Sequence, residues 1–159
     1  MRIRLAGAAA FIALAYPIAS YAAAPMTRAP AVSPAARTAA ATVDAFHAAL
    51  HRGDTRAAAA LLADDALIFE EGGAERSKAE YAAQHLQADA EFSRDTTSTV
   101  TRRSARSNGE LAWIASEGRT TGQYRGRTLD RVTVETMVLR RSGRGWKIVH
   151  IHWSSAAPR

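Results

Sequence analysis

The spacing of the apolar residues changes abruptly near residue 95, and this change constrains the fold more than any other feature of the sequence. Before this point apolar side chains recur every three to four residues, as in Val43, Phe46 and Leu50, which is typical of helices that bury one face. From Thr96 onward they alternate, with Thr, Val, Ile and Trp enriched, which is typical of strands. Helices followed by a run of strands predict an α+β domain.

Capping and turn signals divide the first half into three helices and one strand. The first helix is expected over 34–52, and the second over 55–63 behind the N-cap Asp54. A short strand follows at 66–70. The third helix begins at the capping box of residues 77–80 and runs to about residue 91. Helical spacing then predicts one inward-facing stripe, made of Tyr81, His85, Ala88 and Phe92, with Asp89 beside it and Leu86 on the far side.

Turn signals divide the second half into a meander of four antiparallel strands. These are expected at 96–104, 110–122, 128–140 and 146–155, separated by glycine-containing turns. The predicted fold is therefore α+β, with three N-terminal helices packed on a curved, mostly antiparallel sheet.

Strand pairing without bulges predicts which side chains share a face of this sheet. It aligns residue 113 with 137 and residue 137 with 150, which puts Glu135 opposite His152. One face would then mix large apolar side chains with histidines and glutamates, while the other would be almost entirely apolar. Because three helices can cover only one face, a second copy of the chain is expected on the other, and a homodimer is predicted.

The first 24 residues have the form of a secretory signal peptide. Arg2 and Arg4 precede an apolar stretch that Pro17 ends, and small residues follow at the expected cleavage site. Residues 25–37 have the composition of a flexible leader, and 38–159 form the predicted domain. We expect a periplasmic or secreted protein with no stable membrane insertion after processing, because the apolar stretch is too short to span a bilayer.

Composition excludes several classes of function. The chain has no cysteine, so it has no disulfides, thiol nucleophile or cysteine-bound metal. Its formal net charge of +6 falls to +4 once Arg2 and Arg4 are removed, and the arginine clusters lie beside predicted turns without aromatic residues between them. Nucleic-acid binding is therefore not expected. The sequence also lacks a phosphate loop, a dinucleotide fingerprint and a serine nucleophile elbow.

Two long segments resemble a known family. The C-terminal GWKIVHIHWSS, residues 145–155, and the stretch AFHAALHRGDTRAAAALLADDALIFEEGG, residues 45–73, are similar to SnoaL-like proteins of the nuclear transport factor 2-like superfamily. The resemblance implies a cystatin-like, cone-shaped α+β barrel with a pocket between sheet and helices, usually dimerising through the sheet. Its members include ketosteroid isomerase-like enzymes, which need a carboxylate base and a tyrosine and acid pair. Tyr81 is a candidate donor and Glu135 or Glu117 a candidate base.

The mixed sheet face supplies the predicted catalytic residues. His152, His150 and Glu135 would lie together there, and a carboxylate beside an imidazole is a general acid–base arrangement. The expected pocket walls are Tyr81, His85, Trp113, Glu117 and Met137. This indicates a small-molecule-binding domain with isomerase, dehydratase or hydrolase activity. The alternative is a non-catalytic dimerisation or metal-binding accessory protein.

A metal site is the second hypothesis. His85 and Asp89 stand four residues apart and could meet His150, His152 or a glutamate of Glu70-Glu71, as zinc or copper ligands. No cofactor is otherwise expected. His47 and His51 have the same spacing but fall at the edge of an apolar stripe, which favours a surface position.

Overall fold

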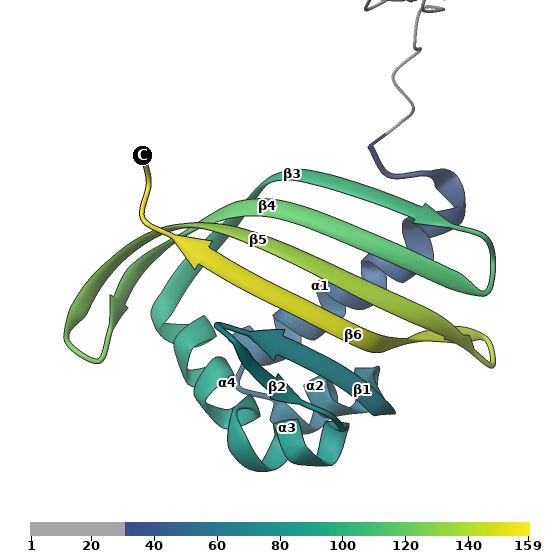
Figure 1. Cartoon of the computed structure of the whole chain (residues 1–159), viewed down its shortest axis with the longest axis horizontal. Coiled ribbons are helices and arrows are strands. Elements are labelled where there is room, and N and C mark those ends of the chain that lie inside the picture. Colours follow the sequence, from purple (N-terminus) through teal and green to yellow (C-terminus); the bar gives the residue numbers. More distant parts are fainter. Residues whose placement is uncertain (1–30) are drawn as a thin grey trace, which may run out of the picture.

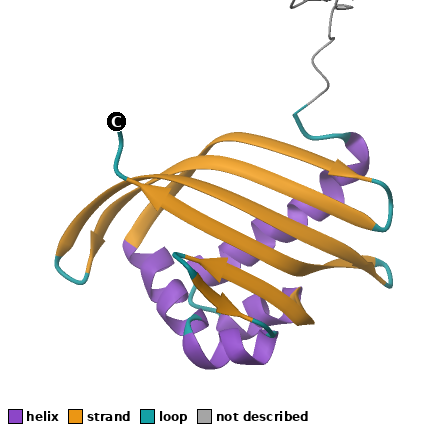
Figure 2. Ribbon diagram, viewed as in Figure 1, coloured by secondary structure: helices purple, strands orange, loops and turns teal. Residues whose placement is uncertain are grey.

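Four α-helices lie against one face of a six-stranded sheet in the computed structural model, which describes residues 31–159 (Figures 1 and 2). The predicted signal peptide and residues 25–30 lie outside these described residues. No helix within 31–159 has both the length and the apolar character needed to cross a membrane. The elements are η1 (Pro34–Ala36), α1 (Arg37–His51), α2 (Thr55–Leu61), β1 (Leu62–Glu70), β2 (Gly73–Glu75), α3 (Lys78–Gln84), α4 (Leu86–Asp95), β3 (Thr96–Ser107), β4 (Leu111–Tyr124), β5 (Arg127–Ser142) and β6 (Gly145–Ala156).

The sheet has the strand order β2-β1-β6-β5-β4-β3. The meander β3 to β6 is antiparallel, as the alternating sequence predicted. β1 pairs parallel to β6, the last strand in the chain. The helical half of the sequence therefore also contributes strands to the sheet. The predicted α+β class is confirmed.

The core lies between α1 and the concave face of the sheet, where α1 runs diagonally across the strands (Figure 1). Phe46 of α1 and Ile114, Met137 and Ile151 of β4, β5 and β6 are all fully buried there. Burying a large apolar side chain contributes about 1.5–3 kcal/mol, so this layer is the main source of stability.

The third predicted helix is in fact two. The chain leaves helical geometry at His85, whose φ is −119°, and α4 starts again at Leu86. The break rotates the helical stripe, so Leu86 is buried while His85 is exposed. Tyr81 is buried and Ala88 and Phe92 are half-buried, in line with the predicted stripe. The predicted inward position of His85 and the far-side position of Leu86 are wrong.

A β-bulge in β6 overturns the predicted faces of the sheet. Val138 pairs with His150 but Leu139 pairs with Ile148, so Val149 is an extra residue without a partner. Glu135 consequently lies opposite Trp153 rather than opposite His152.

The β4–β5 register also differs by one residue from the bulge-free pairing, since Trp113 pairs with Val138. A shift of one residue moves side chains to the opposite face. The concave face therefore carries Ile114, Glu135, Met137, Ile151 and Trp153, and the outer face carries Trp113, Glu117, Val134, His150 and His152.

The outer face has no cover within the described chain. Its large apolar side chains stay accessible, with Trp113 41% exposed and Val134 53% exposed, and Phe69 of β1 lies at the same face beside His152. The homodimer that would cover this face stays a prediction.

The domain begins earlier than the sequence indicates. Val32 forms a parallel bridge with Ala105 of β3, and Ser33 N donates to the Ala105 carbonyl at 3.1 Å. Residues 31–36, which the sequence assigned to the leader, are therefore attached to the edge of the sheet.

The concave core should dominate stability. Ile114→Ala removes buried methyl groups from a site with 0% exposure and should lower the free energy of unfolding by about 2–5 kcal/mol in urea titrations. Val100→Ala, at a 52% exposed position on the edge strand, is the control and should change it by less than about 1 kcal/mol. Equal losses in both variants would contradict this assignment of the core.

Candidate functional site

Three polar side chains form a row across three neighbouring strands of the concave face. Glu70 of β1 pairs with Trp153 of β6, and Trp153 pairs with Glu135 of β5. Because strands lie about 4.8 Å apart, the backbones of the two glutamates are separated by about 10 Å, with the indole between them. This row is the centre of the candidate site.

Aromatic rings pack around Trp153 from two helices. Phe46 of α1 stacks on it with ring centroids 6.3 Å apart, and Tyr81 of α3 lies 6.5 Å away in a tilted arrangement. Such contacts fix the orientation of the indole and exclude water around it. Each of the two carboxylates therefore has this aromatic cluster on one side.

Glu70 lies at the end of β1, and it keeps access to solvent. Loss of water around its carboxyl group, together with the negative charges of Asp89 and Glu71, raises the Glu70 pKa to about 7, although His85 opposes the shift. A carboxyl group with a pKa near neutrality can both accept and release a proton at physiological pH.

A tyrosine and an acid are paired beside Glu70. The Tyr81 hydroxyl donates to Asp89 Oδ2 at 2.6 Å, and Tyr81 is 1% exposed. Burial raises the Asp89 pKa above its ordinary value even though the hydrogen bond from Tyr81 lowers it. Burial and the nearby charge of Asp89 also raise the Tyr81 pKa, so this hydroxyl stays protonated. Tyr81 thus keeps its hydroxyl hydrogen, which Asp89 accepts in this arrangement.

His85 closes the same side of the site. Its Nδ1 contacts Glu75 of β2, whose side chain is buried, and this hydrogen bond raises the His85 pKa. This hydrogen bond therefore favours the protonated form of His85 among the acidic residues Glu70, Glu75 and Asp89.

A second polar group lies on the other side of Trp153. Trp153 Nε1 donates to Glu135 Oε2 at 2.8 Å, and His47 Nε2 of α1 lies 2.7 Å from the same oxygen. Burial works to raise the Glu135 pKa, but these hydrogen bonds, the His47 charge and Arg103 hold it below its ordinary value. Glu135 is therefore an ionised, buried carboxylate with its partners in place.

The structure separates the predicted catalytic residues. Glu135 is in the site, whereas His150 and His152 lie on the outer face, where His150 Nδ1 donates to the Leu67 carbonyl at 2.9 Å and Phe69 packs against both rings. The predicted cluster of His152, His150 and Glu135 was wrong, because the bulge at Val149 reverses the faces.

The predicted pocket walls are separated in the same way. Tyr81 and His85 lie at the site, Met137 is fully buried in the core, and Trp113 and Glu117 are exposed on the outer face. Glu117, a candidate base, instead pairs with Arg102 at 3.7 Å.

The structure gives no geometric support to the metal hypothesis. Asp89 is bonded to Tyr81 and His85 contacts Glu75, while His150 and His152 lie on the far side of the sheet. Within residues 31–159, no three histidine, aspartate or glutamate side chains lie close enough to hold a metal ion.

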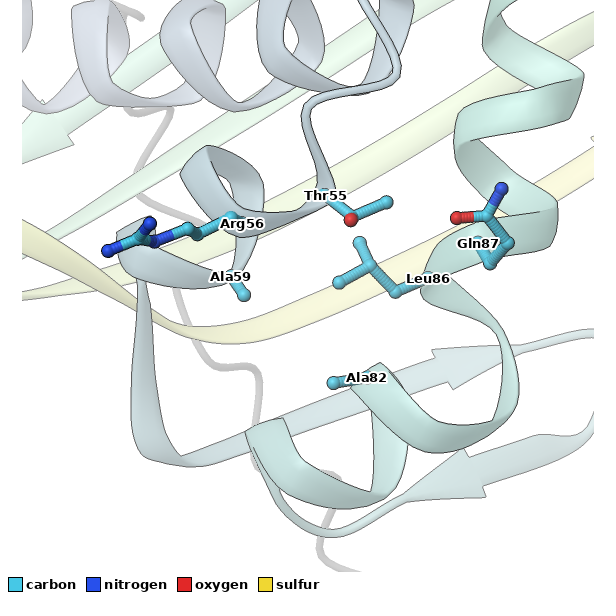
Figure 3. Close-up of a pocket in the computed structure, with 6 residues that line it drawn as sticks. All are labelled: Thr55, Arg56, Ala59, Ala82, Leu86 and Gln87. Atoms are coloured by element: carbon cyan, nitrogen blue, oxygen red, sulfur yellow. The ribbon is translucent and has the colours of Figure 1, made fainter.

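Two surface hollows lie away from this row. One, of about 260 Å³, lies between α2 and the α3–α4 break (Figure 3) and is lined by Thr55, Arg56, Ala59, Ala82, Leu86 and Gln87. The other, of about 410 Å³, lies beside the start of β1 and the β5–β6 turn, where Lys78 pairs with Asp64 and Arg140 with Asp65. The first lining contains no acidic residue, and the two aspartates of the second are held in these ion pairs.

Sequence reasoning missed several residues of the site, among them Glu70 and His47. Glu70 was considered only as a metal ligand, although its position at the end of a short strand was a usable signal. His47 was assigned to the surface, because nothing local in the sequence indicates a partner 88 residues away.

Comparisons agree with this architecture. The family model described as SnoaL-like domain matches residues 39–158. A Shewanella frigidimarina protein, provisionally assigned as a ketosteroid isomerase, is 36% identical over 78% of this chain and 100% of its own, with a TM-score of 0.73. The chain therefore belongs to the SnoaL-like family, within the nuclear transport factor 2-like group.

More distant structures show the fold alone. A Xanthomonas campestris protein, provisionally assigned as an association domain of calcium/calmodulin-dependent protein kinase II, is 22% identical over 76% of this chain and 87% of its own, with a TM-score of 0.66. A Caulobacter vibrioides protein with a cystatin-like fold is 14% identical over 79% of this chain and 92% of its own, with a TM-score of 0.68. The search of curated proteins found no match.

The raised pKa of Glu70 should appear as a dependence of stability on pH. The folded protein holds the Glu70 proton more tightly than the unfolded chain, in which the Glu70 pKa is about 4.5. The stability from neutral Glu70 is therefore full below about pH 4.5 and lost as the pH rises through about 7. Glu70→Gln should thus gain about 1 kcal/mol over wild type between pH 4.5 and pH 8 in urea titrations, a modest value because the side chain stays solvent-exposed.

The matched control is Glu110→Gln, which removes the same charge from an exposed turn. It should show no such pH-dependent gain. If the two variants behave alike, the raised Glu70 pKa is wrong.

Proposed function

We propose that the protein is an exported acid–base enzyme of isomerase or lyase type that acts on an uncharged small molecule with a carbonyl group. The observation that carries the proposal is the Glu70 carboxyl group, with a pKa raised to about 7, beside the Tyr81–Asp89 hydrogen-bonded pair. The likeness to the provisionally assigned ketosteroid isomerase supports the same reaction class. The signal-like sequence of residues 1–24 supports export.

The proposed chemistry begins with proton abstraction beside the carbonyl group. The Glu70 carboxylate removes the α proton, and the C–H electrons move toward the carbonyl oxygen to form an enolate. The Tyr81 hydroxyl transfers its hydrogen bond from Asp89 to this oxygen, where charge develops. Glu70 then returns its proton to another carbon of the ligand, which completes an isomerisation without loss of atoms.

The charges at the site favour an uncharged ligand. Four acidic residues, Glu70, Glu71, Glu75 and Asp89, lie around His85, so an anionic ligand would be repelled at this end of the site. A carbonyl oxygen carries no full charge until the transition state, when the Tyr81 hydroxyl can donate to it.

Activity should depend on Glu70 more than on any outer-face residue. With 5-androstene-3,17-dione as the test substrate, formation of the conjugated enone is followed by ultraviolet absorbance. Glu70→Gln should lower kcat by at least about 100-fold, because the variant cannot accept a proton. Tyr81→Phe should lower it by about 10-fold or more through loss of a donor.

His152→Ala is the matched control, because the structure places this residue on the outer face. It should leave the rate within about 3-fold of wild type. Wild-type protein that does not turn over the ketosteroid, or a Glu70→Gln variant as active as wild type, would sink the proposal for this substrate class.

We further propose that the outer face is covered by a second copy of the chain. Trp113, Val132 and Val134 are 41%, 43% and 53% exposed on adjacent strands, an apolar patch of the kind that marks an interface. The Xanthomonas campestris relative, provisionally assigned as an association domain, supports assembly through this scaffold. An isologous dimer would pair the patch with itself.

Sedimentation analysis should therefore find wild-type protein as a dimer. Val134→Asp places a charge in the patch and should shift the protein to monomer at micromolar concentration, with its circular dichroism spectrum unchanged. Gln84→Asp, an exposed change on α3, should leave the dimer intact. A monomeric wild-type protein would refute the second-copy assignment.

A further inference from the structure

The His47–Glu135 pair has the form of a second acid–base group in the same site. His47 Nε2 lies 2.7 Å from Glu135 Oε2, and a carboxylate can only accept, so Nε2 carries the hydrogen. The second ring nitrogen, Nδ1, is then the basic atom of the neutral imidazole. The His47 side chain is 41% exposed while that of Glu135 is 10% exposed, so the ring is anchored at one edge and accessible at the other.

Polar and charged groups from four elements hold this pair in place. Trp153 of β6 donates to the same Glu135 oxygen, and Arg103 of β3 acts on Glu135 by its positive charge. Arg103 is itself fixed by Asp44 of α1 at 2.6 Å and by Ser116 of β4 at 3.1 Å. The carboxylate therefore stays ionised and the imidazole stays oriented, as in other carboxylate–histidine pairs that transfer protons.

The two acid–base groups lie on opposite sides of one aromatic cluster. Glu135 and Glu70 are the two neighbours of Trp153 in the cross-strand row, and Phe46, which stacks on Trp153, has its ring 5.7 Å from that of His47. Trp153 is partly exposed between them, so a ligand beside its indole would have a carboxyl group on one side and an imidazole on the other.

We propose that His47 is a second proton-transfer residue, oriented by Glu135, and that the site is suited to the dehydration of an uncharged β-hydroxy ketone. This inference rests on the proposed function of Glu70 and extends it to a defined substrate class. It also assigns Glu135 as a positioning residue.

The proposed step balances in atoms and electrons. Ionised Glu70 takes the α proton, and the C–H electron pair forms the new C=C bond. The β C–O bond breaks, and the leaving hydroxyl takes the proton from Nδ1 of protonated His47 to become water. The products are an enone and water, and both residues regain their starting protonation states by exchange with solvent.

Two small ketones that give the same product separate the roles of the residues. Isomerisation of 3-cyclohexenone needs a base and an oxyanion donor but no acid for a leaving group, whereas dehydration of 3-hydroxycyclohexanone needs both. Each yields 2-cyclohexenone, measured by ultraviolet absorbance. His47→Gln should lower dehydration by about 100-fold or more while isomerisation changes by less than about 3-fold. Glu70→Gln should abolish both.

The control variant is His51→Gln, which removes a histidine one turn further along α1, bonded to the Ser93 carbonyl at 2.8 Å. It should leave both rates unchanged. The pH profile of wild-type dehydration should be bell-shaped, because one group must be ionised and the other protonated, and His47→Gln should remove the alkaline limb.

Nitrogen-15 chemical shifts of the imidazole test the geometry without any substrate. Wild-type His47 in its neutral form should be protonated at Nε2, and Glu135→Gln should give a mixture of tautomers. An Nδ1-protonated His47, or equal losses of both reactions in His47→Gln, would overturn the inference while leaving the role of Glu70 intact. Wild-type protein inactive on both ketones would overturn the proposed function and this extension together.

Discussion

The single extra residue at Val149 determines which side chains of β6 enter the site. Because the bulge shifts the pairing between Val138 and Leu139, the two histidines of β6 turn outward and Trp153 turns inward. Trp153 then lies between Glu70 on β1 and Glu135 on β5, and its indole nitrogen can donate to Glu135. The parallel pairing of β1 completes the arrangement, since β1 lies on the side of β6 opposite β5 and places Glu70 next to Trp153.

The surroundings of the acidic residues shift their pKa values in opposite directions. Glu70 and Asp89 lose water without gaining an adequate cation, and each pKa rises. Glu135 is also buried but receives hydrogen bonds from His47 and Trp153, and its pKa falls. Carboxyl groups held in opposite states are a hallmark of acid–base sites, because one can exchange protons while the other supplies a fixed charge. The mutual repulsion of Glu70, Glu75 and Asp89 also opposes stability, which favours a functional role for this cluster.

Periodicity predicted the elements but not their exact contacts. The four strands of the meander were expected within about three residues of their observed bounds, because alternation and glycine turns are local signals. The break at His85 was not predicted, since Gln84-His85-Leu86 contains neither glycine nor proline. The bulge at Val149 was missed for the same reason, because valine suits a regular strand equally well. One unpredicted residue in β6 was enough to exchange the faces of its histidines and Trp153.

The sequence also predicts only some of the individual residues of the candidate site. Tyr81 and Glu135 were predicted as site residues, because inward helical spacing and the family resemblance pointed to them. Glu70 and His47 acquire their roles from partners far away in the chain, and only the folded register brings them together. The chemistry nevertheless constrains the ligand. An anion bound beside Glu70 would raise the Glu70 pKa further, so the ionised base would be lost at neutral pH. An uncharged carbonyl compound leaves the Glu70 pKa near 7. The charge of the site therefore selects for the class of ligand on which Glu70 can act as a base.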